Sequence, residues 1–220
     1  SECTKRDLIS HFEIDKRKIR VVHLAASDEY QPSSLDWVEA VQKKFYISRP
    51  YFLSVGSAPR KNIERIIRAF AESEKALDFI LVLVCHLDIP KYKELCLSLG
   101  VQDRVIFVNS ASQAELIALY SGCYCFLFPS LYEGFGLPIL EAMQCGAPVI
   151  TSNTSACPEV ATGAALLVNP VKISEISEAI NQLCSNSDLR GSLIQKGFKH
   201  AKNFSWKRFG EQMLSIYQGA

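Results

Sequence analysis

The chain has 220 residues, of which 48% are hydrophobic and 21% charged, so it fits one sizeable packed domain and excludes disordered and collagen-like proteins. Lysine and arginine number 24 against 23 aspartates and glutamates. Because the chain has no overall excess of positive charge, its composition does not indicate a nucleic-acid partner. The longest apolar run, at 79–85, is far shorter than the roughly 20 residues of a membrane-spanning helix.

The first residues differ in pattern from the rest of the chain. DLISHFEI at 7–14 predicts a helix, KIRVVHLA at 18–25 predicts a strand, and the polar stretch EYQPSSLD at 29–36 is typical of a linker. These segments are too short to form a domain alone. Because the chain starts with neither an initiator methionine nor a signal peptide, we expect it to begin inside a longer protein or to follow a cleaved tag.

From residue 50 onward, short apolar segments alternate with amphipathic helical patterns. The predicted strands are PYFLSV at 50–55, FILVLVC at 79–85, RVIFV at 104–108, YCFLFP at 124–129, PVIT at 148–151 and AALLV at 164–168. Parallel neighbours need a crossover connection, and the helices must bury their apolar stripes against the sheet. The order therefore predicts an α/β protein with a doubly wound parallel sheet, whose ligands bind beyond the carboxyl ends of the strands.

Helical patterns lie between and after these strands. One predicted helix carries an apolar stripe made by Ile63, Ile66, Ile67 and Phe70. Ser112 and Glu115 form a capping box that predicts the start of another helix. Three helical patterns follow the last strand, and the final one contains Trp206, Phe209, Met213, Leu214 and Tyr217.

Eight cysteines are scattered through apolar or helical stretches, without the paired spacing of a zinc site or a disulfide scaffold. The nearest pair, Cys123 and Cys125, falls on one face of a predicted strand. We expect buried, reduced thiols and no metal site. Reduced thiols favour the cytoplasm as the location, with the cytoplasmic face of a membrane as an alternative.

The densest pattern is YEGFGLPILEAMQCGAPVI at 132–150, where a loop runs from Glu133 into a helix that begins near Leu137. Glycines on both sides of Phe135 let the backbone approach a ligand, and the amides of Phe135, Gly136 and Leu137 would point at an anion such as a phosphate. Glu133 and Glu141 can face one cleft from different levels. The competing interpretation is a glycine-rich turn with two solvated glutamates.

This segment resembles the signature of the retaining glycosyltransferases of family four, or glycosyl transferases group 1, which include sucrose synthases, trehalose-phosphate synthases and bacterial mannosyltransferases. The resemblance rests on two glutamates separated by seven residues within PSLYEGFGLPILEAMQCGAPVI. It implies a two-domain GT-B architecture, of which this chain is the Rossmann-like C-terminal half. It also implies that Glu133 contacts the hydroxyls of the donor sugar and that Glu141 holds the nucleotide ribose.

A second segment, YFLSVGSAPRKNIERIIRAF at 51–70, resembles the other signature of the family. The resemblance implies that Lys61 contacts the donor diphosphate, which suits a compact cation beside a helix start. The pattern alone is also compatible with Arg60 and Lys61 as solvated loop cations. Ser57 follows Gly56 where the family commonly has arginine, and Arg60 is the candidate to replace that charge.

Two further positions depart from the family, which usually has glycine at both. The first is Cys85, whose side chain could crowd a nucleotide, followed by His86. We expect His86 to be a surface or packing residue, with a contact to the base as the alternative. The second is Asn109, which tolerates a left-handed backbone and stays in the predicted donor-binding set.

The resemblance covers nearly everything from residue 50 to the end, and the opening residues resemble the final segment of the family's acceptor domain. It implies four parts. They are a remnant of the acceptor domain at 1–30, a linker at 31–48, a Rossmann-like donor-binding domain at 49–204, and a C-terminal helix at 205–220 that packs toward the acceptor domain.

By resemblance, the chain binds a UDP- or GDP-hexose and passes the hexose to a saccharide or lipid-linked acceptor in polysaccharide or glycoconjugate synthesis. Glu133 and Lys61 are the predicted catalytic residues. The predicted donor-binding residues are Gly56, Arg60, Lys61, Asn109, Glu133, Phe135, Gly136, Leu137 and Glu141. The resemblance implies no metal, no cofactor and no firmly placed protein nucleophile. Without the acceptor-binding half, the isolated chain is expected to transfer poorly, and peripheral membrane association is compatible with such acceptors.

Three alternatives stand beside this interpretation. The chain could be a catalytically silent nucleotide-binding half that acts with a partner subunit, or a sugar-nucleotide epimerase of the same architecture. It could also be an ordinary dinucleotide-binding domain. The residues after the first predicted strand, Gly56, Ser57 and Ala58, lack the glycine fingerprint that a pyrophosphate turn requires, which argues against the last alternative.

Overall fold

The computed structural model of the chain describes residues 1–85 and 89–219, and a single parallel sheet lies at its centre. The strand order is β3-β2-β1-β4-β5-β6, the order of a doubly wound nucleotide-binding sheet. The strands are β1 (Tyr51–Val55), β2 (Ile80–Val84), β3 (Val105–Val108), β4 (Cys125–Phe128), β5 (Val149–Ser152) and β6 (Leu166–Val168). Each coincides with a segment where the sequence predicted a strand, except that β5 continues one residue further, to Ser152, and the predicted fold class is confirmed.

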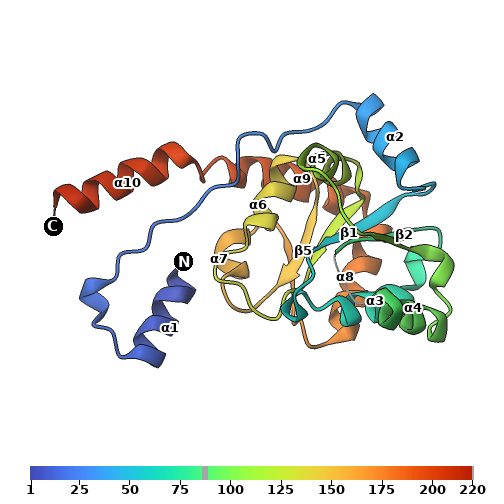
Figure 1. The fold of residues 1–220 in the computed structure, drawn as a ribbon, viewed down its shortest axis with the longest axis horizontal. Helices are drawn as coiled ribbons and strands as arrows, with labels where there is room; N and C mark the ends of the chain where they lie inside the picture. The colour runs from blue at the N-terminus through green and yellow to red at the C-terminus, as the bar shows by residue number, and fades with distance from the viewer. Residues whose placement is uncertain (86–88, 220) are drawn as a thin grey trace.

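Helices cover both faces of this sheet (Figure 1). The helices of the described residues are α1 (Glu2–Phe12), α2 (Leu35–Lys44), α3 (Ile63–Glu72), α4 (Ile89–Ser98), α5 (Gln113–Gly122), α6 (Leu137–Gln144), α7 (Cys157–Ala161), α8 (Ile173–Ser185), α9 (Ser187–Ala201) and α10 (Trp206–Gln218), of which α1 and α10 lie away from the two faces. Short 3-10 helices occupy Lys16–Lys18, Pro59–Lys61, Glu74–Ala76 and Gln102–Arg104. The helices around Ile63–Phe70, after Ser112 and from Leu137 were all predicted by the sequence.

Two apolar cores lie on opposite faces of the sheet. Successive strand residues point to opposite faces, so Leu53 of β1 joins the core under α2, α5, α6 and α7, whereas Phe52 joins the core under α3, α4 and α8. The stripe of α3 that includes Ile66 and Ile67 is completely buried. Because both faces are covered, the loops at the strand ends are where the sheet meets a ligand.

The capping box of α5 has the predicted geometry. The Ser112 hydroxyl accepts from the Glu115 amide at 3.4 Å, and the Glu115 carboxylate accepts from the Ser112 amide at 2.8 Å. Lys44 of α2 makes an ion pair with the same carboxylate. The hydrogen bonds from Lys44 and Ser112 together lower the pKa of Glu115. The box therefore also ties α2 to the sheet domain.

Residues before β1 differ from their prediction in two ways. Residues 18–25 form no strand, because a strand needs a hydrogen-bonded neighbour and no described strand pairs with them. The segment expected to be a polar linker contains the start of α2 at Leu35. The helix forms there because Val38 and Val41 lie on one face and are buried against the sheet domain.

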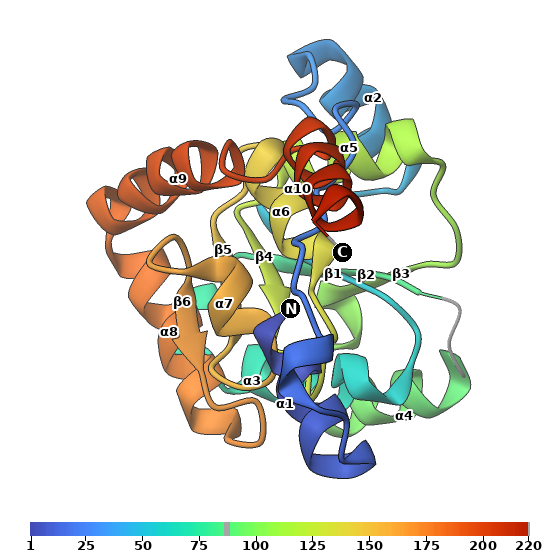
Figure 2. The same cartoon turned by 90° about the vertical axis from the view of Figure 1, so that its left-hand side faces the viewer.

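Helix α1 and helix α10 lie on one side of the domain, at the left of Figure 1 and in front of it in Figure 2, and the chain between α1 and α2 runs from that side across the top of Figure 1. Helix α1 contacts the loop that follows β4 and helix α7, which follows β5, and these contacts place it over the carboxyl edge of the sheet. Helix α10 projects from the body and contains no buried residue.

All eight cysteines are free, and seven of them are buried, as predicted. Burial raises the pKa of the Cys85 thiol and of the Cys96 thiol to about 11, so both stay protonated and unreactive at neutral pH. Within residues 1–85 and 89–219, no helix has the length and apolar character needed to cross a bilayer.

Candidate functional site

The site lies where the loops after β1 and β4 meet. These strands are 73 residues apart in the chain but are neighbours in the sheet, with Phe52 opposite Cys125. The amide of Leu131, after β4, donates to the carbonyl of Arg60 at 2.8 Å. The side-chain amide of Asn62 donates to the carbonyl of Pro129 at 3.0 Å. The two loops are therefore joined by hydrogen bonds and present their side chains together.

Lys61 and Glu133 form an ion pair at this junction. The Lys61 Nζ lies 2.7 Å from the Glu133 Oε1, and about one tenth of each side chain is exposed. The ammonium also lies 4.2 Å from the centre of the Phe128 ring. Arg60 lies further out, with its Nε 3.8 Å from the same oxygen and half of its side chain exposed. The structure thus brings together three of the predicted site residues as one carboxylate with two cations.

Gly56 makes room for Lys61. Its φ of +120° is strained for any residue with a side chain, and a Cβ there would lie 2.9 Å from the Lys61 Cγ. The Gly56 amide donates to the Val84 carbonyl of β2 at 3.0 Å, which fixes the start of the loop. Glycine at this position therefore serves a packing need of the site.

The loop after β4 leads into the first turn of α6 through Gly136, whose φ is +107°. Among the described residues, no protein acceptor bonds the amides of Phe135 and Gly136, and the Leu137 amide begins a helix, where no preceding turn supplies a carbonyl. The Phe135 side chain is buried against His23 and Phe204, so its backbone is the part that faces a ligand. Free amides at a helix start attract anions.

Glu141 lies one turn into α6, below the loop. Burial raises its pKa, while a hydrogen bond from the Tyr120 hydroxyl to Oε2 at 3.3 Å and the charge of Lys61 act in the opposite direction. Lys61 therefore lies near enough for its charge to act on Glu141, although its ion pair is with Glu133. That the two carboxylates face one cleft from different levels stays a prediction.

The remaining predicted residues lie further from the ion pair. Asn109 is exposed at the carboxyl end of β3, which is two strands away from β1. Cys85 is buried and directly follows β2, with its amide bonded to the Val108 carbonyl at 3.0 Å. His86 lies outside the described residues. Within residues 1–85 and 89–219, no group of three or more His, Cys, Asp or Glu residues could hold a metal ion.

The structure adds residues that the motifs did not identify. The Glu133 amide donates to the Ser155 hydroxyl at 3.0 Å, and the Ala156 amide donates to the Glu133 carbonyl at 3.3 Å. On the other side, the hydroxyls of Ser1 and Thr4 donate to the Gly134 carbonyl. All of these contacts hold backbone atoms. A motif search for charged or glycine residues gives no signal for them, although Ser155 has a φ of +55° that only the folded chain reveals.

The chain is similar to known proteins both in sequence and in fold. The sequence profile of the family described as Glycosyl transferases group 1 matches residues 37–200. The chain is 31% identical to the O-antigen chain mannosyltransferase B of Escherichia coli, over 99% of this chain and 59% of that protein. It is 28% identical to the MMP alpha-(1->4)-mannosyltransferase of Mycolicibacterium hassiacum, over 100% of this chain and 53% of that protein. The chain thus spans little more than half the length of these relatives.

Solved structures show the same fold. WaaG, a glycosyltransferase involved in lipopolysaccharide biosynthesis, matches with a TM-score of 0.82 at 20% identity, over 98% of this chain and 60% of that one. Anabaena HepE, crystallised in complex with UDP-glucose, matches with a TM-score of 0.89 at 18% identity, over 100% of this chain and 62% of that one. The described domain therefore has the architecture of the corresponding part of a GT-B glycosyltransferase.

We predict that Gly56→Ala destabilises the protein and displaces Lys61. A side chain at this φ costs about 1–3 kcal/mol, and the added methyl group also meets the lysine stem. Thermal unfolding measures the first effect, and a crystal structure of the variant measures the second. Gly163→Ala is the matched control, because Gly163 also has a positive φ but nothing lies within 4 Å of the position that an added methyl group would take. Equal stability losses in both variants would remove the packing role of Gly56.

Proposed function

Because the chain belongs to the group 1 glycosyl transferase family, we propose that it is the donor-binding part of a retaining hexosyltransferase that uses a nucleoside-diphosphate hexose. The observation that carries the proposal is the ion pair of Lys61 with Glu133 beside the free amides of the α6 start, with Glu141 one turn further along that helix. A cation with free amides suits a diphosphate, and two carboxylates suit the hydroxyls on either side of it. A nucleotide sugar has this alternation of groups.

Lys61 and the α6 start bind the diphosphate. The lysine is held beside the loop by Glu133 and by the Phe128 ring, so its charge is already in place before a ligand arrives. The amides of Phe135 and Gly136 add partial positive charge from the helix start. Arg60, half exposed at the rim, supplies a second cation whose contribution is more strongly screened by solvent.

The two glutamates contact the two ends of the donor. Glu133 accepts hydrogen bonds from hydroxyls of the hexose, and Glu141 accepts from the ribose. Their different surroundings suit these roles, because Glu133 is balanced by Lys61 whereas Glu141 is buried beside the Tyr120 hydroxyl. Binding of the ribose supplies Glu141 with the hydrogen bonds that its burial withholds.

In the reaction, the bond between the anomeric carbon and the diphosphate breaks, and negative charge grows on the leaving group. Lys61 and the α6 amides stabilise that charge, which is electrostatic stabilisation by groups already oriented. The acceptor hydroxyl attacks from the face that the diphosphate leaves and passes its proton to the departing diphosphate oxygen, and so the anomeric configuration is retained. Glu133 orients the sugar. No residue of this chain is assigned as a nucleophile and no metal or cofactor is given a role.

The named relatives support particular chemical classes for the donor and the acceptor. The O-antigen chain mannosyltransferase B supports a mannosyl donor and a saccharide acceptor, and the HepE complex supports a UDP-hexose as the alternative donor. Eight free cysteines support the reducing cytoplasm as the location of the reaction. Residues 49–204 form the donor domain in this proposal, and the acceptor is bound by a second domain that faces α1 and α10.

We predict that Lys61→Ala weakens binding of a nucleoside diphosphate by roughly 10- to 150-fold, because a charge-assisted hydrogen bond is worth about 1.5–3 kcal/mol. Binding of the bare nucleoside should change little. Titration calorimetry with UDP, GDP and their nucleosides measures both. Lys172→Ala is the control, since Lys172 also makes an ion pair, with Glu175 at 3.0 Å, at the start of α8. Equal losses for nucleoside and diphosphate would exclude Lys61 from the phosphate site.

We predict that substitutions of the two glutamates affect the binding of different ligands. Glu141→Gln should weaken nucleoside, diphosphate and nucleotide sugar alike, by about tenfold. Glu133→Gln should weaken only the nucleotide sugar, because loss of Glu133 leaves Lys61 free for the diphosphate. Since burial raises the pKa of Glu141, nucleoside affinity of the parent protein should fall on acidification at a higher pH than an exposed glutamate would allow. This fall should be absent from Glu141→Gln. If Glu133→Gln reduced the affinity for free nucleoside diphosphate as strongly as Glu141→Gln does, the assignment of Glu133 to the hexose and Glu141 to the ribose would be contradicted.

We predict that this 220-residue chain binds the nucleotide sugar but transfers its hexose poorly. The relatives are nearly twice as long, and positioning of the acceptor contributes on the order of 7–11 kcal/mol to lowering a barrier. Calorimetry measures binding. A radiolabelled transfer assay measures activity, first on this chain alone and then after addition of the part of a longer relative that this chain does not match. Rapid transfer by the chain alone would contradict the need for a second domain. Absence of binding to every UDP, GDP and ADP sugar would overturn the proposed function.

A further inference from the structure

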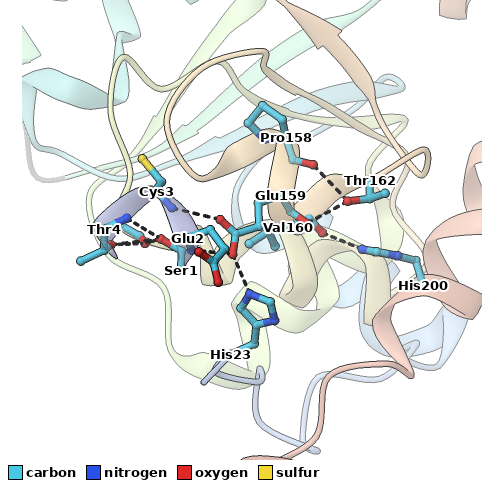
Figure 3. A network of polar contacts seen from close by, with 11 residues as sticks. Ser1, Glu2, Cys3, Thr4, His23, Pro158, Glu159, Val160, Thr162 and His200 are labelled. Carbon is cyan, nitrogen blue, oxygen red and sulfur yellow. Dashed lines mark hydrogen bonds and ion pairs between the residues drawn. The ribbon is translucent and has the colours of Figure 1, made fainter. Parts of the chain in front are cut away.

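The amino end of α1 is anchored on one carboxylate of the sheet domain, that of Glu159 in α7. The Glu2 amide donates to its Oε1 at 2.9 Å, and the Cys3 amide donates to its Oε2 at 3.3 Å (Figure 3). These amides belong to the first turn of α1, which has no carbonyl of its own to accept them. Glu159 therefore caps a helix that lies more than 150 residues away in the chain.

His23 shares this carboxylate. Its Nε2 donates to the Glu159 Oε1 at 2.6 Å, and its ring lies 5.8 Å from the ring of Phe135. Burial of Glu159 raises its pKa, but the hydrogen bonds from Glu2, His23 and Cys3 outweigh burial and lower it overall. The group is thus a carboxylate at neutral pH, and it holds α1 and His23 at the same point (Figure 3).

Both anchored groups touch the loop that carries Glu133. We call residues 132–136 the donor loop. The hydroxyls of Ser1 and Thr4 donate to the Gly134 carbonyl at 2.6 Å and 3.0 Å, and His23 packs on Phe135. The Tyr132 hydroxyl also makes a hydrogen bond with Asp7 of α1. Every one of these contacts comes from the segment before residue 24.

The donor loop needs such support because of its composition. Two of its five residues are glycines, which have the largest conformational freedom, and Gly134 has no side chain by which the domain could hold it. From within the sheet domain, the Glu133 backbone is held by the Ser155 hydroxyl and the Ala156 amide. The next peptide along is held from outside, by α1.

From this geometry we infer that Glu159 is a positioning residue of the donor site, which holds α1 and His23 against the donor loop and so fixes Glu133 and the amides of the α6 start. The inference deepens the proposed function and rests on it where ligands are concerned. It also makes the site dependent on the chain that precedes the sheet domain. A displacement of α1 and His23 then moves the donor loop, because they contact it at Gly134 and Phe135.

Amide hydrogen exchange, followed by NMR on the 220-residue chain, tests the inference without any ligand. In Glu159→Gln, an amide nitrogen replaces one acceptor oxygen, so the side chain cannot accept from both Glu2 and Cys3. We expect exchange of the Glu133 and Ala156 amides to become about five- to tenfold faster, because their opening is no longer opposed by α1. Thr4→Val removes one hydroxyl from Gly134 without touching Glu159, and it should accelerate the same amides.

Glu175→Gln is the matched control. Glu175 also accepts a backbone amide, from Asn169 at 2.8 Å, and pairs with a cation, Lys172. Its described contacts lie at the start of α8, away from the donor loop. This variant should leave the exchange of Glu133 and Ala156 unchanged. Faster exchange confined to Glu2 and Cys3 in Glu159→Gln would make Glu159 a helix cap alone and would overturn the inference.

Binding supplies the second measurement. Glu159→Gln and Thr4→Val should each weaken UDP- or GDP-hexose about five- to tenfold and leave the bare nucleoside unchanged, because Glu141 lies outside the donor loop. The double variant should lose less than the product of the two single losses, since both act through the same carbonyl. Additive losses, or equal losses for the nucleoside, would contradict the inference. If the parent protein binds no nucleotide, the proposed function fails, whereas the exchange measurement still decides the role of Glu159.

Discussion

The adjacency of β1 and β4 is the constraint on which the site depends. The strand order runs outward in two directions from this pair, so α3 after β1 and α6 after β4 cover opposite faces of the sheet, while the loops before them are joined by hydrogen bonds. Lys61 and Glu133 meet at that junction, although 72 residues separate them in the chain. A different neighbour for β1 would leave each charge without its partner. The ion pair is thus a consequence of sheet topology.

Burial sets how strongly these charges act. Both members of the pair are about nine-tenths covered, where an unpaired charge is costly and a paired one is held firmly. The Phe128 ring under the ammonium and the absence of a side chain at Gly56 define the space that Lys61 occupies. Glu141 is partly buried, no cation among the described residues contacts it, and burial raises its pKa. A ligand with one anionic centre between two hydroxyl-bearing rings matches this distribution of charge.

The site is also held from two directions. Ser155 and Ala156, after β5, fix the backbone of Glu133 from within the sheet domain. Helix α1, capped by Glu159, reaches Gly134 from the other side. This contact links the donor loop to chain that precedes the sheet domain. Under the proposed function, the geometry of donor binding and the position of that chain are physically coupled.

The sequence by itself determined the sheet domain and its charged residues. Continuous apolar strands between amphipathic helices allow one packing solution, and the motifs around Lys61, Glu133 and Glu141 lie within stretches of local pattern. Residues 18–25 show where a prediction from local sequence fails. A strand-like sequence forms a strand only where a neighbouring strand can pair with it, and no described strand lies beside this segment. The tertiary structure alone decided the ion pair, the raised pKa of Glu141 and the contacts of Glu159 with α1. Each of these depends on segments that are distant in the chain. Many of the contacts use backbone atoms, which every residue has, so the residue types in the sequence give no signal for them.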